Sequence, residues 1–452
     1  MEFALDSGNT AWILTSSALV LLMTPGLAFF YGGMVRGKSV LNMMMMSFAA
    51  LGLVSVIWVL WGYSGAFGSD IGGVIGDPFE FFGVSTITDE QSLMAAAGVP
   101  ALVAVAFQAT FAIITVALIS GAVADRMKFS AWLVFAGVWV SLVYVPIAHM
   151  VWGGGLLGPT GITEAISVPI DFAGGTVVHI NAGIAGLVLA LIIGKRRGFG
   201  KEPMRPHNLP FVMLGAALLW FGWFGFNAGS EFAADGTAGR AWVNTLAATA
   251  FAMLTWLGTE KVRDGHATSL GAASGVVAGL VAITPAAASV DTFGALAIGG
   301  VAGILCALAV GLKYRFGYDD SLDVVGVHLV GGLTGTVLIG LFANVGEGVN
   351  GTWYLEGSQN GLFYGGGLDQ LVTQVVVAAA ALVFSGVLTA VIALAIKAVM
   401  GLRVSDDVEV SGIDLAVHGE GAYEALGGSF VRTGDAGPVT SGASRTTTEV
   451  KA

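Results

Sequence analysis

Two histidines in apolar stretches are the residues of this chain best placed to do chemistry. His179 lies in TVVHINAGIAGLVL, residues 176–189, and His328 lies in VGVHLVGGLTGTVL, residues 325–338. Aligned on the histidines, the two stretches share valines, glycines and a leucine at matching positions, which indicates an internal repeat. Ionisable side chains in an apolar membrane setting are costly and usually mark a transport path. We therefore predict that the pair forms a relay or lines a path.

A structural role for these residues is the alternative. A single histidine in a membrane helix can simply hydrogen-bond a neighbouring helix, but two histidines related by a repeat favour a joint function. Each neutral imidazole has one donor and one acceptor nitrogen, so a hydrogen-bonded pair can pass a proton. The accompanying glycines are predicted to be packing contacts between helices: Gly183, Gly186, Gly332 and Gly335.

The amino-acid composition indicates that these histidines lie in a membrane protein. The chain has 452 residues, of which 55% are hydrophobic and 11% charged, against roughly a quarter charged in soluble domains. The sequence therefore predicts an all-α polytopic membrane protein. The single Cys306 excludes an intramolecular disulfide, and the net charge of -11, without a basic patch, predicts no nucleic-acid partner. The acidic N-terminus predicts no cleaved signal peptide.

Apolar runs long enough to cross roughly 30 Å of hydrocarbon predict eleven transmembrane helices. They are expected near residues 10–31, 39–66, 98–121, 129–148, 172–194, 209–228, 238–258, 268–287, 293–311, 323–344 and 368–399. Every Lys and Arg except Arg240 falls in alternate loops or in the tail. Cytoplasmic loops collect such residues, so we expect the N-terminus outside and the C-terminus in the cytoplasm.

The two histidines occupy corresponding positions in the fifth and tenth predicted spans. This divides the chain into two five-helix repeats, about 10–194 and 209–344, with an extra helix at about 368–399. Five is odd, so the second repeat is inverted relative to the first. Each histidine lies about seven residues into its span, roughly 10 Å deep from opposite faces. The two side chains are therefore expected to meet near the membrane centre.

The chain is expected to divide into a transmembrane domain, residues 1–401, and a cytoplasmic tail, residues 402–452. The tail is rich in Gly, Ser, Thr and Asp, and its distal part, which includes GPVTSGASRTTTEVKA, is predicted to be disordered.

Longer motifs resemble one family throughout most of the chain. DFAGGTVVHINAG, from Asp171 to Gly183, is similar to the signature of ammonium transporters, and TPGLAFFYGG, FQATFAIITV, HMVWGGGLL, PHNLP and WFGFNAGS recur in the family's order. This family includes the methylammonium permeases and the Rhesus glycoproteins, and the match is strongest to the prokaryotic ammonium transporter branch. The resemblance implies a homotrimer in the plasma membrane, with a hydrophobic pore in each protomer that contains His179 and His328.

The resemblance also implies a substrate site at the outer mouth of the pore. Trp152 and Ser230 match the residues that recruit the cation, Phe111 and Phe226 match the rings that gate the pore, and Asp171 matches an aspartate needed for transport. Each of these residues can also be explained by a purely structural role. Trp152 fits the aromatic belt at a membrane surface, the phenylalanines fit core packing, and Asp171 fits a helix cap.

A neutral pore explains how ammonium is distinguished from potassium. An apolar passage penalises every ion by several kcal/mol but admits neutral ammonia, and potassium has no proton to give up. We expect ammonium or ammonia as the substrate, with methylammonium as a further candidate, and neither enzymatic activity nor a cofactor or metal. The segment GIDLAVHGEGAY, which contains His418, resembles the surface through which relatives contact a PII-type signal protein.

Other functions remain open at this stage. A neutral ammonia gas channel and an ammonium sensor share the same motifs. Conduction of carbon dioxide or water is a further possibility. Two histidines on membrane helices could also ligate haem in an electron carrier, which a Soret band would reveal. Direct use of ATP is not expected, because no GxxxxGK[ST] loop is present.

Overall fold

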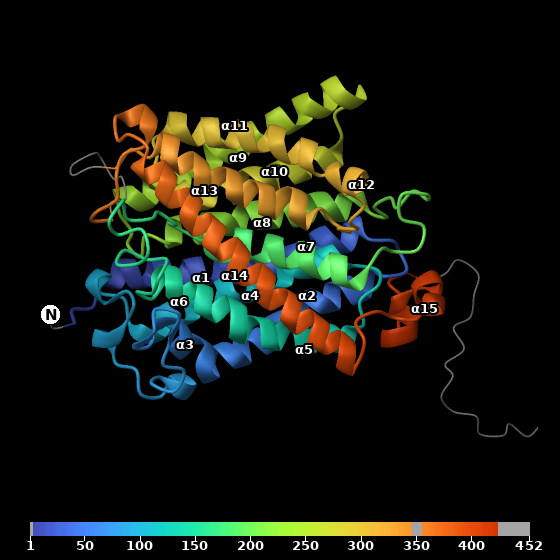
Figure 1. Cartoon of the computed structure of the whole chain (residues 1–452), viewed down its shortest axis with the longest axis horizontal. Helices are drawn as coiled ribbons and strands as arrows, with labels where there is room; N and C mark the ends of the chain where they lie inside the picture. The colour runs from blue at the N-terminus through green and yellow to red at the C-terminus, as the bar shows by residue number, and fades with distance from the viewer. Residues whose placement is uncertain (1–2, 346–354, 424–452) are drawn as a thin grey trace, which may run out of the picture.

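The computed structural model describes residues 3–345 and 355–423 and consists almost entirely of helices. The predicted disorder of the distal tail falls outside these residues. The long helices lie side by side in one bundle, with the N-terminus at one end and helix α15 at the other (Figure 1). We call these the N-terminal end and the tail end.

The bundle contains fifteen α-helices within the described residues. Their bounds are α1 Ser7–Met34, α2 Val40–Ile57, α3 Tyr63–Phe67, α4 Ala101–Ile119, α5 Phe129–Trp139, α6 Val145–Trp152, α7 Asn181–Ile193, α8 Leu209–Gly229, α9 Gly236–Asp264, α10 Ser269–Ile283, α11 Thr292–Ala309, α12 Leu312–Phe316, α13 Val330–Phe342, α14 Asp369–Val399 and α15 Asp406–Ser411. Two short antiparallel strands, β1 Asp70–Ile71 and β2 Ile75–Gly76, form a hairpin at the N-terminal end.

Several of the longest helices contain a π-helical turn. These turns are η1 Trp58–Gly62, η6 Val140–Tyr144, η7 Gly175–Ile180 and η9 Val325–Leu329. Short 3-10 turns η2 Phe82–Val84, η3 Asp89–Gln91, η4 Ala95–Ala97, η5 Ser120–Val123, η8 Thr284–Ala286 and η10 Leu362–Tyr364 occur at helix ends and in loops. Both predicted pore histidines lie in π-turns, His179 in η7 and His328 in η9. Such turns are rare and are frequent at functional sites.

The predicted all-α polytopic class is confirmed. Counted with their π and 3-10 turns, ten helices of the described chain are long and apolar enough to cross a membrane. The remaining long helix, α9, has 29 residues and packs against α10 and α11. It is more polar because it contains residues such as Asn244, whose side-chain amide donates to the carbonyls of Ala287 and Val290 at 2.8 and 2.9 Å. The predicted spans agree with these helices to within a few residues at most ends.

The helices that carry the histidines run in opposite directions. Beyond the end of α7, the guanidinium of Arg196 contacts the carboxylate of Asp319 at 2.8 Å, and Asp319 lies just before η9. At the other end, a Cβ atom on Gly175 would lie 2.9 Å from Oγ1 of Thr336, past the midpoint of the continuous helix Val325–Phe342 that η9 and α13 form. The start of one helix thus lies beside the end of the other, as the inverted repeat predicts.

Glycines allow these two helices to touch at the level of the histidines. A Cβ atom on Gly183 would lie 2.5 Å from the backbone nitrogen of Leu329, and one on Gly332 would lie 3.0 Å from Cβ of His179. Both distances are shorter than an ordinary contact of about 3.5 to 4.0 Å between carbon atoms. The glycines therefore act as packing contacts, which is the role that the sequence predicted for them.

The described part of the tail packs against basic loops at the tail end. The N–H of Lys128 donates to the carbonyl of Leu402 at 2.8 Å, and the N–H of Arg197 donates to Glu409 at 2.7 Å. In η11, Asp414–His418, the Asp414 carboxylate accepts from two backbone N–H groups at the start of α2. The loops that the charge pattern assigned to the cytoplasm thus contact the tail.

Candidate functional site

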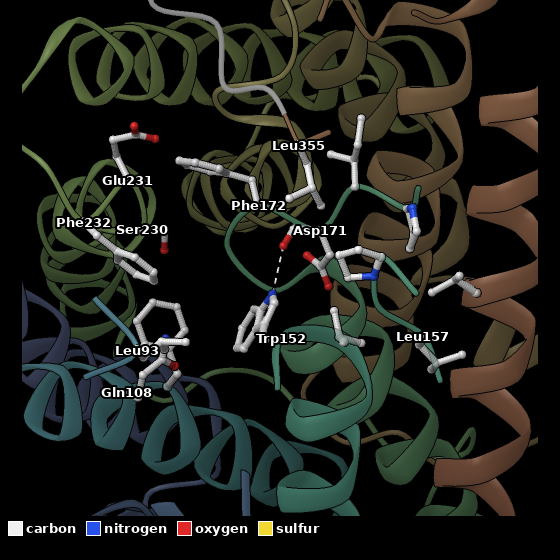
Figure 2. Close-up of a pocket in the computed structure, with 16 residues that line it drawn as sticks. Leu93, Gln108, Trp152, Leu157, Asp171, Phe172, Ser230, Glu231, Phe232 and Leu355 are labelled. Atoms are coloured by element: carbon white, nitrogen blue, oxygen red, sulfur yellow. Dashed lines mark hydrogen bonds between the residues drawn. The ribbon is translucent and has the colours of Figure 1, made fainter. Parts of the chain in front are cut away.

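A cavity of about 260 Å³ opens between helix ends at the N-terminal end of the bundle. We call it the vestibule. Trp152, at the end of α6, and Ser230, directly after α8, both line it, as do Phe111 and Asp171. In Figure 2, the indole of Trp152 extends into the space between Ser230 and Asp171. The structure therefore brings four of the predicted site residues to one cavity.

Trp152 and Ser230 are fixed by bonds to backbone carbonyls. Nε1 of Trp152 donates to the carbonyl of Asp171 at 2.9 Å, the bond drawn in Figure 2. The hydroxyl of Ser230 donates to the carbonyl of Phe226 at 2.8 Å. The Ser230 oxygen keeps its lone pairs to accept a hydrogen bond, and the indole face can attract a cation. Both side chains can therefore contact a cation that donates N–H bonds.

Asp171 is occupied by the backbone that follows it. Its two carboxylate oxygens accept from the N–H groups of residues 174, 175, 176 and 177, at 2.7 to 3.3 Å. Burial raises the pKa of the Asp171 carboxyl above its ordinary value, and these four N–H donors oppose that rise. Gly174 adopts a φ of 116°, which favours glycine, and lets the chain turn around the carboxylate. This geometry supports the structural role of a cap that shapes the vestibule.

Two phenylalanine rings separate the vestibule from the interior. Phe111 and Phe226 stack with their centroids 4.1 Å apart and their planes at 27°, and both side chains are buried. Phe111 lines the vestibule, whereas Phe226 lines a second, internal cavity. The path between the two cavities is closed by this ring pair in the structure.

The internal cavity has a volume of about 10 Å³ and is lined mainly by apolar side chains. Such a volume holds about one water-sized molecule. His179 and His328 contribute to its wall, together with Trp223, whose indole stacks on His179 at 5.4 Å and donates to Thr284 at 2.8 Å. The predicted pore histidines therefore face the same small chamber.

The two imidazoles are in direct contact. Nδ1 of His179 lies 3.4 Å from Nδ1 of His328, and the ring planes are inclined by 23°. Nε2 of His179 is buried without a hydrogen-bond partner. When both rings are neutral, the ring that donates through Nδ1 has a free acceptor at Nε2, and the other ring has a donor there. The pair thus offers the chamber one acceptor and one donor.

Sequence reasoning missed several residues of this site. Trp223 lines the chamber, and Gln108 and Glu231 line the vestibule. Asp320 was also missed, although it stands eight residues before His328 as Asp171 stands eight before His179. Oδ2 of Asp320 accepts from the N–H of Val325 at 2.7 Å, so it caps η9 as Asp171 caps η7. Extending the repeat alignment upstream would have found it.

The fold and the site define a membrane transporter or channel: a polytopic helical bundle with a vestibule, a ring closure and a histidine-lined chamber. Residues 11–423 match the model of the Ammonium Transporter Family. The chain belongs to that family, whose members are transporters or channels rather than enzymes, and this membership supports ammonium transport.

Named relatives agree with this assignment. An "Ammonium transporter" of Mycobacterium tuberculosis is 59% identical over 435 residues, covering 93% of this chain and 91% of the relative. The crystal structure of Saccharomyces cerevisiae Mep2 is 35% identical with a TM-score of 0.80, covering 89% of this chain and 91% of Mep2. A structure titled "Sensor Amt Protein" is 27% identical with a TM-score of 0.81, covering 91% of this chain and 98% of that one.

Proposed function

We propose that this chain takes up ammonium at the vestibule, removes a proton from it, and passes ammonia through the chamber while the histidine pair carries the proton. The observation that carries the proposal is the 3.4 Å contact between Nδ1 of His179 and Nδ1 of His328 on the wall of an apolar chamber. A proton path and a path for a neutral molecule thus run side by side.

Recruitment takes place while the substrate is still charged. The indole face of Trp152 attracts a cation by about 0.5 to 2 kcal/mol, depending on how much water is displaced. The Ser230 oxygen accepts one N–H bond, since its own hydrogen is used by the carbonyl of Phe226. Asp171 acts by holding the carbonyl and the turn to which Trp152 is bonded.

Selectivity arises below the vestibule. Rotation of Phe226 or Phe111 opens the ring pair, and the chamber beyond it has room for about one small molecule. An ion in such an apolar space loses its hydration, which costs several kcal/mol. Ammonium avoids this cost by giving one proton to the acceptor nitrogen of the histidine pair, whereas potassium has no proton to give. The chamber therefore discriminates by chemistry rather than by size.

The histidine pair transfers the proton without becoming doubly charged. Two protonated rings whose Nδ1 atoms lie 3.4 Å apart would repel strongly in a medium of low dielectric constant. A proton accepted at Nε2 of one ring is matched by release at Nε2 of the other, with the Nδ1 proton moving between the rings. These transfers also exchange the donor and acceptor roles of the two rings. Both imidazoles must therefore return to their original tautomers before the pair can pass the next proton.

Three alternatives share part of this geometry. A neutral ammonia gas channel uses the same chamber but moves no charge. An ammonium sensor is favoured by the likeness to the structure titled "Sensor Amt Protein", although the described residues after α14 form only α15 and η11. A haem held by both histidines is disfavoured, since a chamber of about 10 Å³ is far smaller than ligand pockets of roughly 300 to 1,000 Å³.

The proposal extends to topology and assembly. We propose a transmembrane domain of residues 1–401 and a cytoplasmic tail of residues 402–452, with the N-terminal end facing the outside. Support comes from the basic loops that contact the tail, because cytoplasmic loops collect Lys and Arg. Family resemblance supports a homotrimer in the plasma membrane, a PII-type signal protein at the tail end, and methylammonium as a further substrate.

The test is the current evoked by an ammonium pulse on proteoliposomes adsorbed to a supported membrane. We expect a transient current with ammonium and none with equimolar potassium. The double variant His179→Ala, His328→Ala should lose the ammonium current or its selectivity. His266→Ala, which removes an exposed histidine outside the pore, should behave as wild type. An unchanged current and selectivity in the double variant would refute the role of the pair.

A further inference from the structure

Glu231 is a carboxylate in the vestibule that neither the motifs nor the family resemblance assign to the site. It directly follows Ser230 and lines the same cavity, on the same side as Ser230 and Phe232 in Figure 2 and away from Asp171. The side chain is largely buried, and its Oε2 atom has no hydrogen-bond partner. A buried carboxylate oxygen without a partner is costly, so its presence in a cavity calls for a donor.

A second unpaired acceptor lines the same cavity. Oε1 of Gln108, on α4, is also buried without a partner. In Figure 2, however, Gln108 lies on the other side of Ser230 and Phe232 from Glu231. The acceptors that adjoin one another in the chain are therefore the Glu231 carboxylate and the Ser230 oxygen, which keeps free lone pairs. Ammonium is a cation with four N–H donors and no acceptor, and it complements such a set. Potassium would gain the charge attraction but no hydrogen bond.

We propose that Glu231 adds a cation subsite to the vestibule beside Ser230, where it holds ammonium, and that binding requires the ionised form of Glu231. This inference rests on the proposed function and names a further binding residue for it. The carboxylate adds a charge attraction that the aromatic and hydroxyl groups lack.

The ionisation of Glu231 makes this subsite sensitive to pH. Burial, with a contribution from the nearby Asp235, raises the pKa of Glu231 to about 8. Among the described residues, charged groups on neighbouring elements include Arg240 on α9, Asp171 before η7, Asp6 before α1, and Asp89 and Glu90 on η3, just before the vestibule residue Leu93. In the empty vestibule at neutral pH, Glu231 therefore carries a proton, and a bound cation displaces it. Ammonium affinity should increase as the outer pH rises through about 8.

The test measures the half-saturating ammonium ion concentration for the transient current, from roughly pH 7 to roughly pH 9, which brackets this pKa. In the wild type, we expect this concentration to fall as pH rises. Glu231→Gln keeps the shape of the side chain but removes its charge. It should bind about tenfold more weakly at the upper pH, as expected for loss of one nearby charge pair, and should lose the pH dependence. Glu231→Asp, which keeps the charge, should retain the dependence.

Glu164→Gln is the matched control, because it removes one negative charge from an exposed loop position at the same end of the bundle. It should behave as wild type. A wild-type response of Glu231→Gln, or an equal shift in Glu164→Gln, would overturn the subsite. If the wild type itself gave no current at saturating ammonium, the proposed function would fail instead, so the two failures are distinguishable. A maximal current retained in Glu231→Gln shows that this variant folds.

Discussion

The contact between the two histidines should depend on a glycine that touches neither ring. In Gly183→Ala, the new Cβ would lie 2.5 Å from the backbone nitrogen and 2.6 Å from Cα of Leu329. An ordinary contact needs about 3.5 Å, and backbone atoms cannot rotate away. The two helices must therefore separate locally by about 1 Å, and such overpacking costs about 1 to 3 kcal/mol.

This separation acts directly on the histidine pair, since Leu329 follows His328. The Nδ1 to Nδ1 distance would grow from 3.4 Å to about 4.4 Å, past the roughly 3.6 Å at which a side-chain contact no longer counts as a hydrogen bond. The proton path should then be interrupted while both histidines remain. We expect the ammonium current of Gly183→Ala, normalised to the amount of folded protein, or its selectivity over potassium, to change in the same direction as in the double histidine variant.

A matched glycine controls for this substitution. Gly258 lies inside α9, and a Cβ atom there would meet nothing within 4 Å. Gly258→Ala should keep the wild-type current. It should also gain about 0.5 to 1 kcal/mol of stability, because alanine loses less conformational entropy than glycine when the chain folds. Melting in detergent and the pulse current would be measured on both variants. A Gly183→Ala protein that melts lower but keeps a wild-type current would refute the link between the ring contact and transport.

Three further predictions concern carboxylates that hold helix ends. Asp171→Asn replaces one of two acceptor oxygens with an N–H donor that faces backbone N–H groups. The free energy of unfolding should therefore fall by about 2 to 4 kcal/mol, and an unchanged melting temperature would contradict the role of Asp171 as a cap. Burial raises the pKa of the Asp320 carboxyl above its unfolded value of about 3.9, so the wild type should lose stability as pH rises from the unfolded pKa through the raised folded pKa. Melting of Asp320→Asn should lack this pH-dependent loss, and a parallel pH profile would contradict the assignment. Asp414→Ala removes the cap on α2, which should cost about 1 kcal/mol of stability. Proteases should then cleave residues 402–423 faster, and an unchanged cleavage rate would count against a tail that is docked on the bundle.

The sequence predicted the fold to the extent that the membrane dictates it. A helix must cover the hydrocarbon thickness, so apolar length alone placed spans such as 209–228 and 368–399 close to α8 and α14. The histidine stretches were recognisable because an ionisable side chain in an apolar run is rare. Their spacing within the repeat was enough to predict that the rings meet, since the two helices run in opposite directions.

Other features depend on local geometry that spacing does not encode. A π-turn adds one residue to a turn without changing the apolar pattern, so η7 and η9 could not be read from the sequence. The stacking of Phe111 on Phe226 depends on the rotation of two helices about their axes. Glu231 follows Ser230 in an ordinary polar loop by composition, and only its burial beside the vestibule makes it a candidate binding residue.

The separation of proton and ammonia is the central claim, and the ratio of charge moved to nitrogen moved tests it most directly. Current and internal pH would be recorded on the same proteoliposomes after an ammonium pulse, with the double histidine variant in parallel. We predict one elementary charge for each nitrogen that enters, without alkalinisation of the lumen beyond that of empty liposomes. Rapid alkalinisation without current in the wild type would contradict the proton path and favour a neutral ammonia channel.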